Sequence, residues 1–385
     1  FPLLKPYATV TRSLINNTVQ ATVIPVVYGV RMDPFPDPTN ETAEELLICA
    51  VGEPYPLYRF VYIVVAGLIA IGGVGFNILL IALFANRSCA TTPPTLYPSA
   101  LAVLDTLMCV CYVAIMFIDA IVSYLRIESL YALYYSYVIP VYTLSKFVQL
   151  AIPYMLIFAT LERLVWISAK RKNSDRGNRF ARIGVTLVLC AVVRLPTLWA
   201  LEKQEFPDCD DYFRSITTGP STWARTEEWW EMFDFQFMTF VQTFIPFFIL
   251  VTLNAYMFSH SKNMLQHRSS KIIISSLLFA VYSSRALPAH VHGAQHALTE
   301  VRSAILTMLA IVTSYLLCNS LQLVLTLLEK SDSSLLLDPE NPGMSSVFHT
   351  SFGDLISFLY TFTSAVRLFI YAICNTEIRR DLRAM

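Results

Sequence analysis

Polar and charged residues interrupt several long apolar segments. Such residues inside a membrane-length segment are costly, so each one is a candidate functional residue. Asn77 lies in GVGFN and Asp105 in LAVLD, and Glu162 and Arg163 stand side by side in LERLV. Tyr371 lies in RLFIYAICN, just before a short basic stretch. A carboxylate next to a guanidinium at the end of an apolar segment predicts a latch, in which Glu162 holds Arg163 until another group competes for it.

This chemistry is that of a charge switch and not of an enzyme. The chain contains no phosphate-binding GxxxxGK[ST] loop, no HExxH and no GxSxG with suitable partners. We therefore expect no catalytic residues, no metal site and no cofactor.

The composition predicts a membrane protein. Of the 385 residues, 55% are hydrophobic and only 15% are charged, whereas a soluble domain carries about 25% charged residues. This excludes a soluble enzyme, a disordered chain and a disulfide-dense secreted module. Lys and Arg balance Asp and Glu at 28 each, so the charge gives no reason to expect a nucleic-acid partner.

Seven segments are long and apolar enough to cross a bilayer, which takes about 20 residues. They are Phe60–Asn86, Leu96–Leu125, Tyr131–Ser168, Ile183–Leu201, Phe235–His260, Ser303–Leu328 and Leu355–Cys374. Long continuous apolar runs disfavour a β-barrel. We predict an all-α membrane protein with a seven-helix transmembrane domain over 59–375, a tail over 1–58 and a short tail over 376–385 that begins an eighth helix.

The distribution of basic residues predicts the orientation. With the first terminus outside, the inner segments hold fifteen Lys and Arg and the outer loops hold five. Because inner loops carry the excess of basic residues, the N-terminus should face outside and the C-terminus inside, in a multi-pass protein of the plasma membrane. Glycosylation sequons at Asn16 and Asn40 then lie in the outer tail.

The polar residues, taken in order on successive helices, resemble the motifs of the rhodopsin-like G-protein-coupled receptors. The matching residues are Asn77, Asp105, Arg163, Pro246 and Tyr371. The resemblance implies that Arg163 contacts a heterotrimeric G protein when the sixth helix swings outward. It also implies that Asp105 lies in a central polar site that often binds sodium.

The departures from the receptor pattern are equally specific. Asn319 stands where the family usually has Trp, Arg367 where the seventh helix usually has Asn, and Asn254 where the fifth usually has Tyr. Arg367 brings a positive charge towards Asp105, so a salt bridge could replace the sodium ion. These substitutions resemble invertebrate FMRFamide-type neuropeptide receptors, whose fifth helix often ends in PFxxLxxLN and whose sixth carries a Cys-Asn pair.

The ligand candidates lie in the outer halves of the helices. Ser145 stands where amine receptors keep an Asp, so a biogenic amine is not expected. The loop over 202–232 holds eight acidic and three basic residues together with three Trp. A short amidated peptide ending in Arg-Phe would suit this loop, with its guanidinium on carboxylates and its phenyl ring on aromatic rings. Further candidates are Asp119, Lys146, Gln149, Arg194, Gln322 and Asp354.

Three alternatives stay open. The acidic loop could simply be solvated, with its Trp residues in the membrane interface. The ligand could be something other than a peptide. The chain could also be a transporter or channel, although the sequence shows neither the internal repeats nor the interrupted helices that are common in transporters.

Only two of the eight cysteines, Cys49 and Cys209, fall on the oxidising outer side of this topology. The usual receptor disulfide joins the second outer loop to the top of the third helix, but Val138 occupies that region and no Cys is near it. We therefore predict a Cys49–Cys209 disulfide that draws the tail over the ligand entrance.

Overall fold

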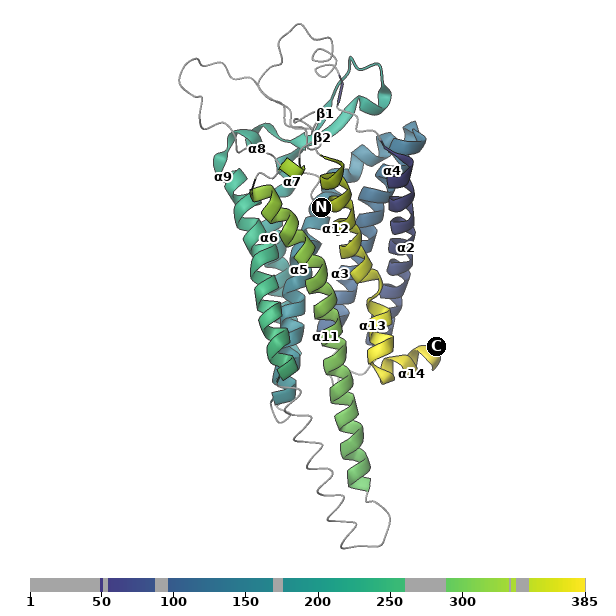
Figure 1. Ribbon diagram of the computed structural model, residues 1–385, viewed down its shortest axis with the longest axis vertical. Helices are drawn as coiled ribbons and strands as arrows, with labels where there is room; N and C mark the ends of the chain where they lie inside the picture. The colour runs from purple at the N-terminus through teal and green to yellow at the C-terminus, as the bar shows by residue number, and fades with distance from the viewer. Residues whose placement is uncertain are drawn as a thin grey trace.

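The computed structural model is an elongated bundle of long helices with a small β-hairpin at one end (Figure 1). The structure describes residues 49–50, 55–86, 96–168, 176–259, 289–331, 334–336 and 346–384. Asn16 and Asn40 lie outside these residues, as does most of the predicted tail.

The predicted transmembrane segments are helical over most of their described length; the predicted segment Ile183–Leu201 is interrupted by a turn at 195–196 and ends in the first residue of a strand. The first five long helical elements are α2 (Leu57–Asn86), α3 (Leu96–Tyr112), α4 (Ile118–Leu125), α5 (Glu128–Ser168) and α6 (Arg176–Arg194). A π-helical turn, η1 (Val113–Phe117), joins α3 to α4 in a single span. The next span covers Phe240–Ser259 and begins with the π-helical turn η4 (Phe240–Phe244).

The last part of the chain supplies α11 (Ala289–Lys330), α12 (Val347–Ala365), α13 (Arg367–Cys374) and α14 (Thr376–Ala384). The axes of α12 and α13 differ by 43°. The described part of the chain therefore has six helices able to cross a membrane, or seven when this bent pair counts as one span. This confirms the predicted number and shows one interrupted helix that the sequence did not indicate.

The segment between α6 and the fifth span folds into short elements at one end of the bundle. They are α7 (Thr197–Ala200), β1 (Leu201–Glu205), η2 (Tyr212–Arg214), β2 (Ile216–Pro220), α8 (Thr222–Thr226), α9 (Glu228–Glu231) and η3 (Met232–Phe237). The strands pair antiparallel, with Leu201 opposite Pro220 and Glu205 opposite Ile216. A single 3₁₀ turn, η5 (Ser334–Leu336), follows α11.

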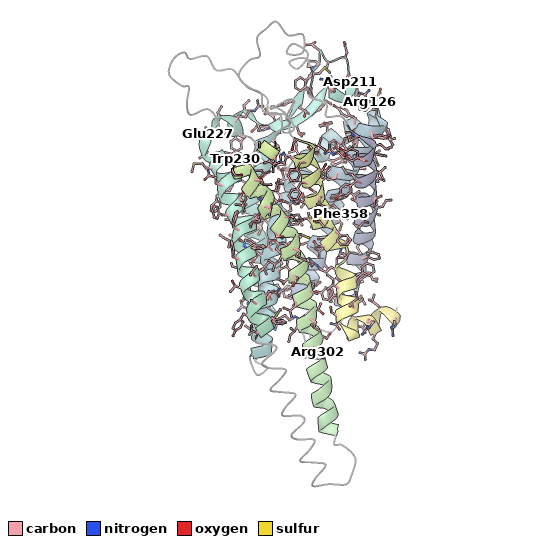
Figure 2. All side chains as sticks on the ribbon, viewed as in Figure 1. Arg126, Asp211, Glu227, Trp230, Arg302 and Phe358 are labelled. Carbon is pink, nitrogen blue, oxygen red and sulfur yellow. A yellow bond between two sulfur atoms is a disulfide. The ribbon has the colours of Figure 1, made fainter. Side chains whose placement is uncertain are left out.

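The hairpin is tied down at several points. Cys49 and Cys209 form a disulfide, as predicted, and the Ala50 amide donates to the Arg214 carbonyl at 3.0 Å. Arg126 lies 2.5 Å from Asp211, and Figure 2 shows this pair at the hairpin end of the molecule. The short helix α14 lies towards the opposite end (Figure 1).

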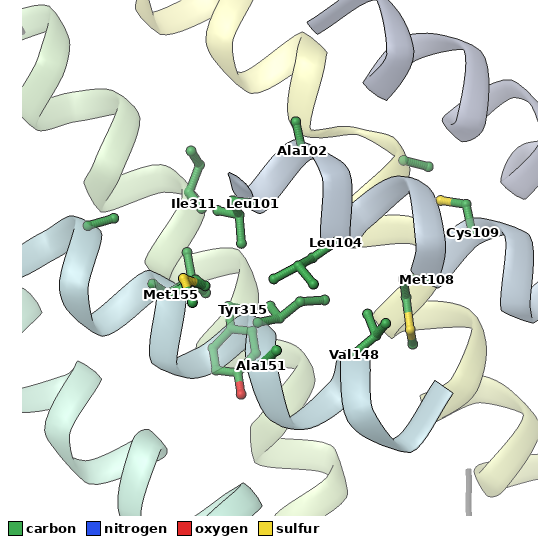
Figure 3. Packing of buried hydrophobic residues seen from close by; sticks show 14 of the residues in the cluster. Leu101, Ala102, Leu104, Met108, Cys109, Val148, Ala151, Met155, Ile311 and Tyr315 are labelled. Atoms are coloured by element: carbon green, nitrogen blue, oxygen red, sulfur yellow. The ribbon is translucent and has the colours of Figure 1, made fainter. Parts of the chain in front are cut away.

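Packed apolar side chains fill the space between the long helices. Leu104 and Met108 of α3 pack with Val148 and Met155 of α5 and with Ile311 of α11 (Figure 3). Each of these residues is at most 5% exposed.

The outward face of α6 is apolar as well. Val185, Val188 and Val192 lie along one face of the helix and are 59–61% exposed. A helix that is apolar on its outside as well as its inside is typical of a membrane span.

Candidate ligand and switch sites

A buried ion pair lies at the centre of the bundle. An Arg367 guanidinium nitrogen contacts one carboxylate oxygen of Asp105, and both residues are at most 2% exposed. The bend at Val366 places Arg367 at the first position of α13. The salt bridge that the sequence suggested is therefore present, and it joins α3 to α13.

Asn77 ties α2 to the same region. Its side-chain nitrogen donates to the carbonyls of Gly73 and Ser364, both at 2.9 Å. Asn319, predicted to belong to this network, has other contacts. It donates to the Tyr315 carbonyl at 2.9 Å and accepts from the Tyr360 hydroxyl at 2.5 Å, so it joins α11 to α12.

The end of α5 away from the hairpin holds the predicted latch residues. Glu162 lies 2.8 Å from Arg179 of α6, a residue that the sequence did not assign to the latch. Arg163 is 7% exposed. Tyr371 is buried against Phe84 of α2, with the two ring centroids 5.4 Å apart. Tyr371 therefore packs α13 against α2.

Two neutral hydrogen bonds hold α11 near this region. The Asn254 side chain donates to the Thr313 hydroxyl at 3.2 Å, which joins the fifth span to α11. The Ser303 hydroxyl donates to the Cys374 carbonyl at 2.8 Å, which joins α11 to the end of α13. Both bonds must change if α11 moves away from its neighbours.

Towards the hairpin end of the bundle, Asp354 already has a cationic partner. Arg59 of α2 lies 2.8 Å from its carboxylate and stacks on the Tyr55 ring, with the guanidinium carbon 4.7 Å from the ring centroid. Burial raises the pKa of the Tyr55 hydroxyl above its usual range, and the Asp119 carboxylate raises it further. The structure therefore gathers both predicted aspartates around Tyr55 and Arg59.

Three other ligand candidates gather between α5, α6 and the fifth span. Arg194 donates to Asp234 at 3.1 Å and also contacts the Gln242 side-chain oxygen. The Gln242 amide in turn donates to the Gln149 oxygen at 3.3 Å. Lys146 lies one turn before Gln149, with its ammonium 5.2 Å from the Tyr142 ring centroid. Gln322, by contrast, contacts Thr326 of its own helix at 3.5 Å.

Comparison with known proteins gives a result at the level of fold. No protein-family model and no curated protein matches the chain. Among solved structures, squid rhodopsin aligns with a TM-score of 0.55 and 14% identity, over 92% of this chain and 82% of the other. This chain has the rhodopsin fold.

Within the rhodopsin fold, the sodium ion that the resemblance implies does not fit the residues at Asp105. The Arg367 guanidinium contacts one of the two carboxylate oxygens and already supplies the compensating charge. A second positive charge in the same buried space would face repulsion at short range. No step below therefore depends on a bound ion.

The sequence located most of the charged candidate residues but not the residues with which they form ion pairs. Arg59 lies just before the first predicted span, and Arg179 and Asp234 lie near the ends of theirs. Each is a charge near an apolar segment, and that is the signal that could have found them. Which segments pack together is set by the fold and cannot be read from spacing.

Proposed function

We propose that the chain is a plasma-membrane G-protein-coupled receptor, with its hairpin end outside and α14 inside. The observation that carries the proposal is the rhodopsin fold with Arg163 buried at the inner end of α5, beside the Glu162–Arg179 ion pair. A buried guanidinium in a membrane span is costly and is therefore a functional candidate by default, and release towards a G protein is the role that we infer for Arg163.

In this proposal, ligand binding shifts a conformational equilibrium. The ligand prefers the arrangement in which α11 has moved away from α13 and the fifth span, so that the Ser303–Cys374 and Asn254–Thr313 bonds are broken. Loss of the Glu162–Arg179 pair then frees the inner ends of α5 and α6 to contact the G protein.

For the ligand, we infer a short cationic peptide, most simply an amidated one ending in Arg-Phe. The outer loop carries exposed carboxylates at Asp208, Asp210 and Glu227 for which the described residues provide no ion pair. Figure 2 shows Glu227 at the same end of the molecule as Asp211. Exposed carboxylates at a binding entrance attract cations. Since Arg59 already pairs with Asp354, a guanidinium on the ligand would meet the loop acids first.

The Trp residues favour the interfacial alternative over direct ligand contact. The Trp223 indole donates to the Trp199 carbonyl at 2.9 Å, and its ring packs edge-on against Trp230 at 5.1 Å. Trp229 is 57% exposed beside this pair. These rings stabilise the segment over 222–233, and an exposed Trp at this height suits the membrane interface.

A nucleotide-exchange assay tests the receptor proposal. Cells expressing the full chain would be treated with a panel of short amidated peptides, and G-protein activation would be measured with surface expression. We expect activation that Arg163→Ala abolishes at unchanged surface expression. The control is Thr252→Ala, because Thr252 is exposed on the fifth span and its hydroxyl donates to the Phe248 carbonyl of its own helix at 2.9 Å. Full signalling by Arg163→Ala would contradict the proposal, and so would ion current or uptake without G-protein activation.

A further inference from the structure

The polar cluster between α5, α6 and the fifth span has buried donors that its own residues do not satisfy. The Gln149 side-chain nitrogen and the Ser145 hydroxyl have no hydrogen-bond partner among the described residues. Gln149 is 6% exposed and Ser145 is fully buried. An unsatisfied buried donor costs about 1–3 kcal/mol, and an acceptor bound here would remove that cost for both donors.

The two donors face the same side of one helix. Ser145 and Gln149 are four residues apart on α5, which places them one above the other. The Gln149 amide is oriented towards the cluster, because its oxygen accepts from Gln242 of the fifth span. The Ser145 and Gln149 donors therefore lie next to the Arg194 network.

The charges of this cluster favour an acceptor that is negative or strongly dipolar. The cluster contains two cations, Lys146 and Arg194, and one carboxylate, Asp234. The charges of Arg194 and Asp234 both act on Lys146. The outer loop above has the opposite excess, with eight acids against three bases over 202–232. A ligand that suits both regions carries a cation on its outer part and an acceptor on the part that enters the bundle.

We propose that Ser145, Lys146 and Gln149 bind the terminal carbonyl group of a peptide ligand, either a carboxamide or a carboxylate. The inference rests on the proposed receptor function and adds the polarity of the bound ligand. The peptide lies with its carboxyl end against α5 and its guanidinium towards the hairpin. Ser145 and Gln149 donate to the carbonyl oxygen, and Lys146 supplies a charge-assisted contact.

Three small probes test this directly on the full chain purified in lipid nanodiscs. They are N-acetyl-Arg-Phe-amide, N-acetyl-Arg-Phe with a free carboxylate, and N-acetyl-Arg-phenethylamide, which lacks the terminal carbonyl. Dissociation constants would be measured by calorimetry without G protein. We expect both carbonyl-bearing probes to bind about tenfold or more tightly than the third, the value of one charge-assisted hydrogen bond. Tighter binding of the amide or of the acid identifies which form the site prefers.

Variants then assign the effect to residues. Lys146→Met should weaken the carboxylate probe by about tenfold or more, and Lys146→Arg should retain most of its affinity. Gln149→Leu and Ser145→Ala should weaken both carbonyl-bearing probes. The matched control is Thr143→Ala on the same helix, because the Thr143 hydroxyl already donates to the Ile139 carbonyl at 3.1 Å. The melting temperature of each variant without probe separates lost binding from lost folding.

The proposal is wrong if the phenethylamide probe binds as tightly as the others, if none of the three binds, or if affinities persist in folded Lys146→Met and Gln149→Leu. Failure of the receptor proposal looks different. Selective binding of the carbonyl-bearing probes without any nucleotide exchange would refute the receptor function and keep the site. If peptides drive nucleotide exchange but the three probes bind equally tightly, the receptor function stands and the proposed carbonyl site is refuted.

Discussion

The Asp105–Arg367 pair allows a quantitative test of how the bundle is held at its centre. Both side chains are almost completely buried, and they join α3 to the first residue after the bend in the last span. Removing one partner of a buried pair leaves an uncompensated charge and costs about 3–5 kcal/mol. Replacing both partners with apolar residues of similar size is neutral or stabilising by up to about 4 kcal/mol.

The perturbation is therefore a double-mutant cycle of Asp105→Leu, Arg367→Met and the double variant, with unfolding measured in nanodiscs. Each single variant should unfold more easily by several kcal/mol, and the double variant should regain most of that loss. The coupling energy between the two sites should exceed about 2 kcal/mol, well above the 0.5 kcal/mol that independent sites show. A single Arg367→Met variant as stable as the wild type would refute the pair as drawn, and so would a double variant whose loss equals the sum of the singles.

Sodium provides the second readout of the same cycle. In the wild type, exchanging choline for sodium at constant ionic strength should leave unfolding unchanged, because the guanidinium already neutralises Asp105. In Arg367→Met the buried carboxylate needs a cation, so sodium should raise stability, and it should have no effect in the double variant. Sodium stabilisation of the wild type would contradict the exclusion of the ion by Arg367.

Three further predictions use other contacts. Gly73→Ala should lower the free energy of unfolding by about 1–3 kcal/mol, because the added carbon would lie 2.6 Å from the Ala365 side chain. Gly75→Ala is the control: nothing lies within 4 Å of its added carbon, so its stability in the same unfolding assay should be unchanged or slightly higher. Tyr131→Phe removes a hydroxyl that donates to the Ile216 carbonyl at 2.9 Å and accepts from the Ile216 amide at 3.0 Å, at the start of β2. Hydrogen exchange of the β2 amides should therefore accelerate. Unchanged protection of these amides would contradict a stabilising role for the hydroxyl. Glu162→Gln weakens the 2.8 Å pair with Arg179 and should raise basal nucleotide exchange about fivefold or more, while unchanged exchange at normal surface expression would argue against a latch.

The sequence predicted the spans and the central pair well for clear physical reasons. Apolar runs of membrane length leave few alternatives to a helix. Arg367 stood inside such a run, where a charge requires a partner of opposite sign. The disulfide followed because Cys49 and Cys209 were the two cysteines on the oxidising side of the topology.

The hairpin end was predicted less completely, because its contacts join segments that are distant in the sequence. The strands β1 and β2 are five residues each, too short for an alternating pattern to be distinguished from a loop. Arg59 and Asp354 are 295 residues apart, and nothing in either local sequence selects the other. The same limit applies to Glu162, whose neighbour Arg163 was the obvious partner until α6 placed Arg179 beside it.

The polar ties between helices also differ in kind, and the difference bears on which helix can move. Arg–carboxylate pairs join α2 to α12, α3 to α13, α5 to α6, and α6 to the segment before the fifth span. Near the hairpin end of α11, the Glu329 carboxylate lies 3.6 Å from His349 of α12. Farther from the hairpin, the ties that the described residues show for α11 are the neutral bonds of Ser303 and Thr313. A neutral hydrogen bond contributes about 1 kcal/mol and a buried ion pair costs several to break, so among these described polar ties the two neutral bonds of α11 cost the least free energy to break.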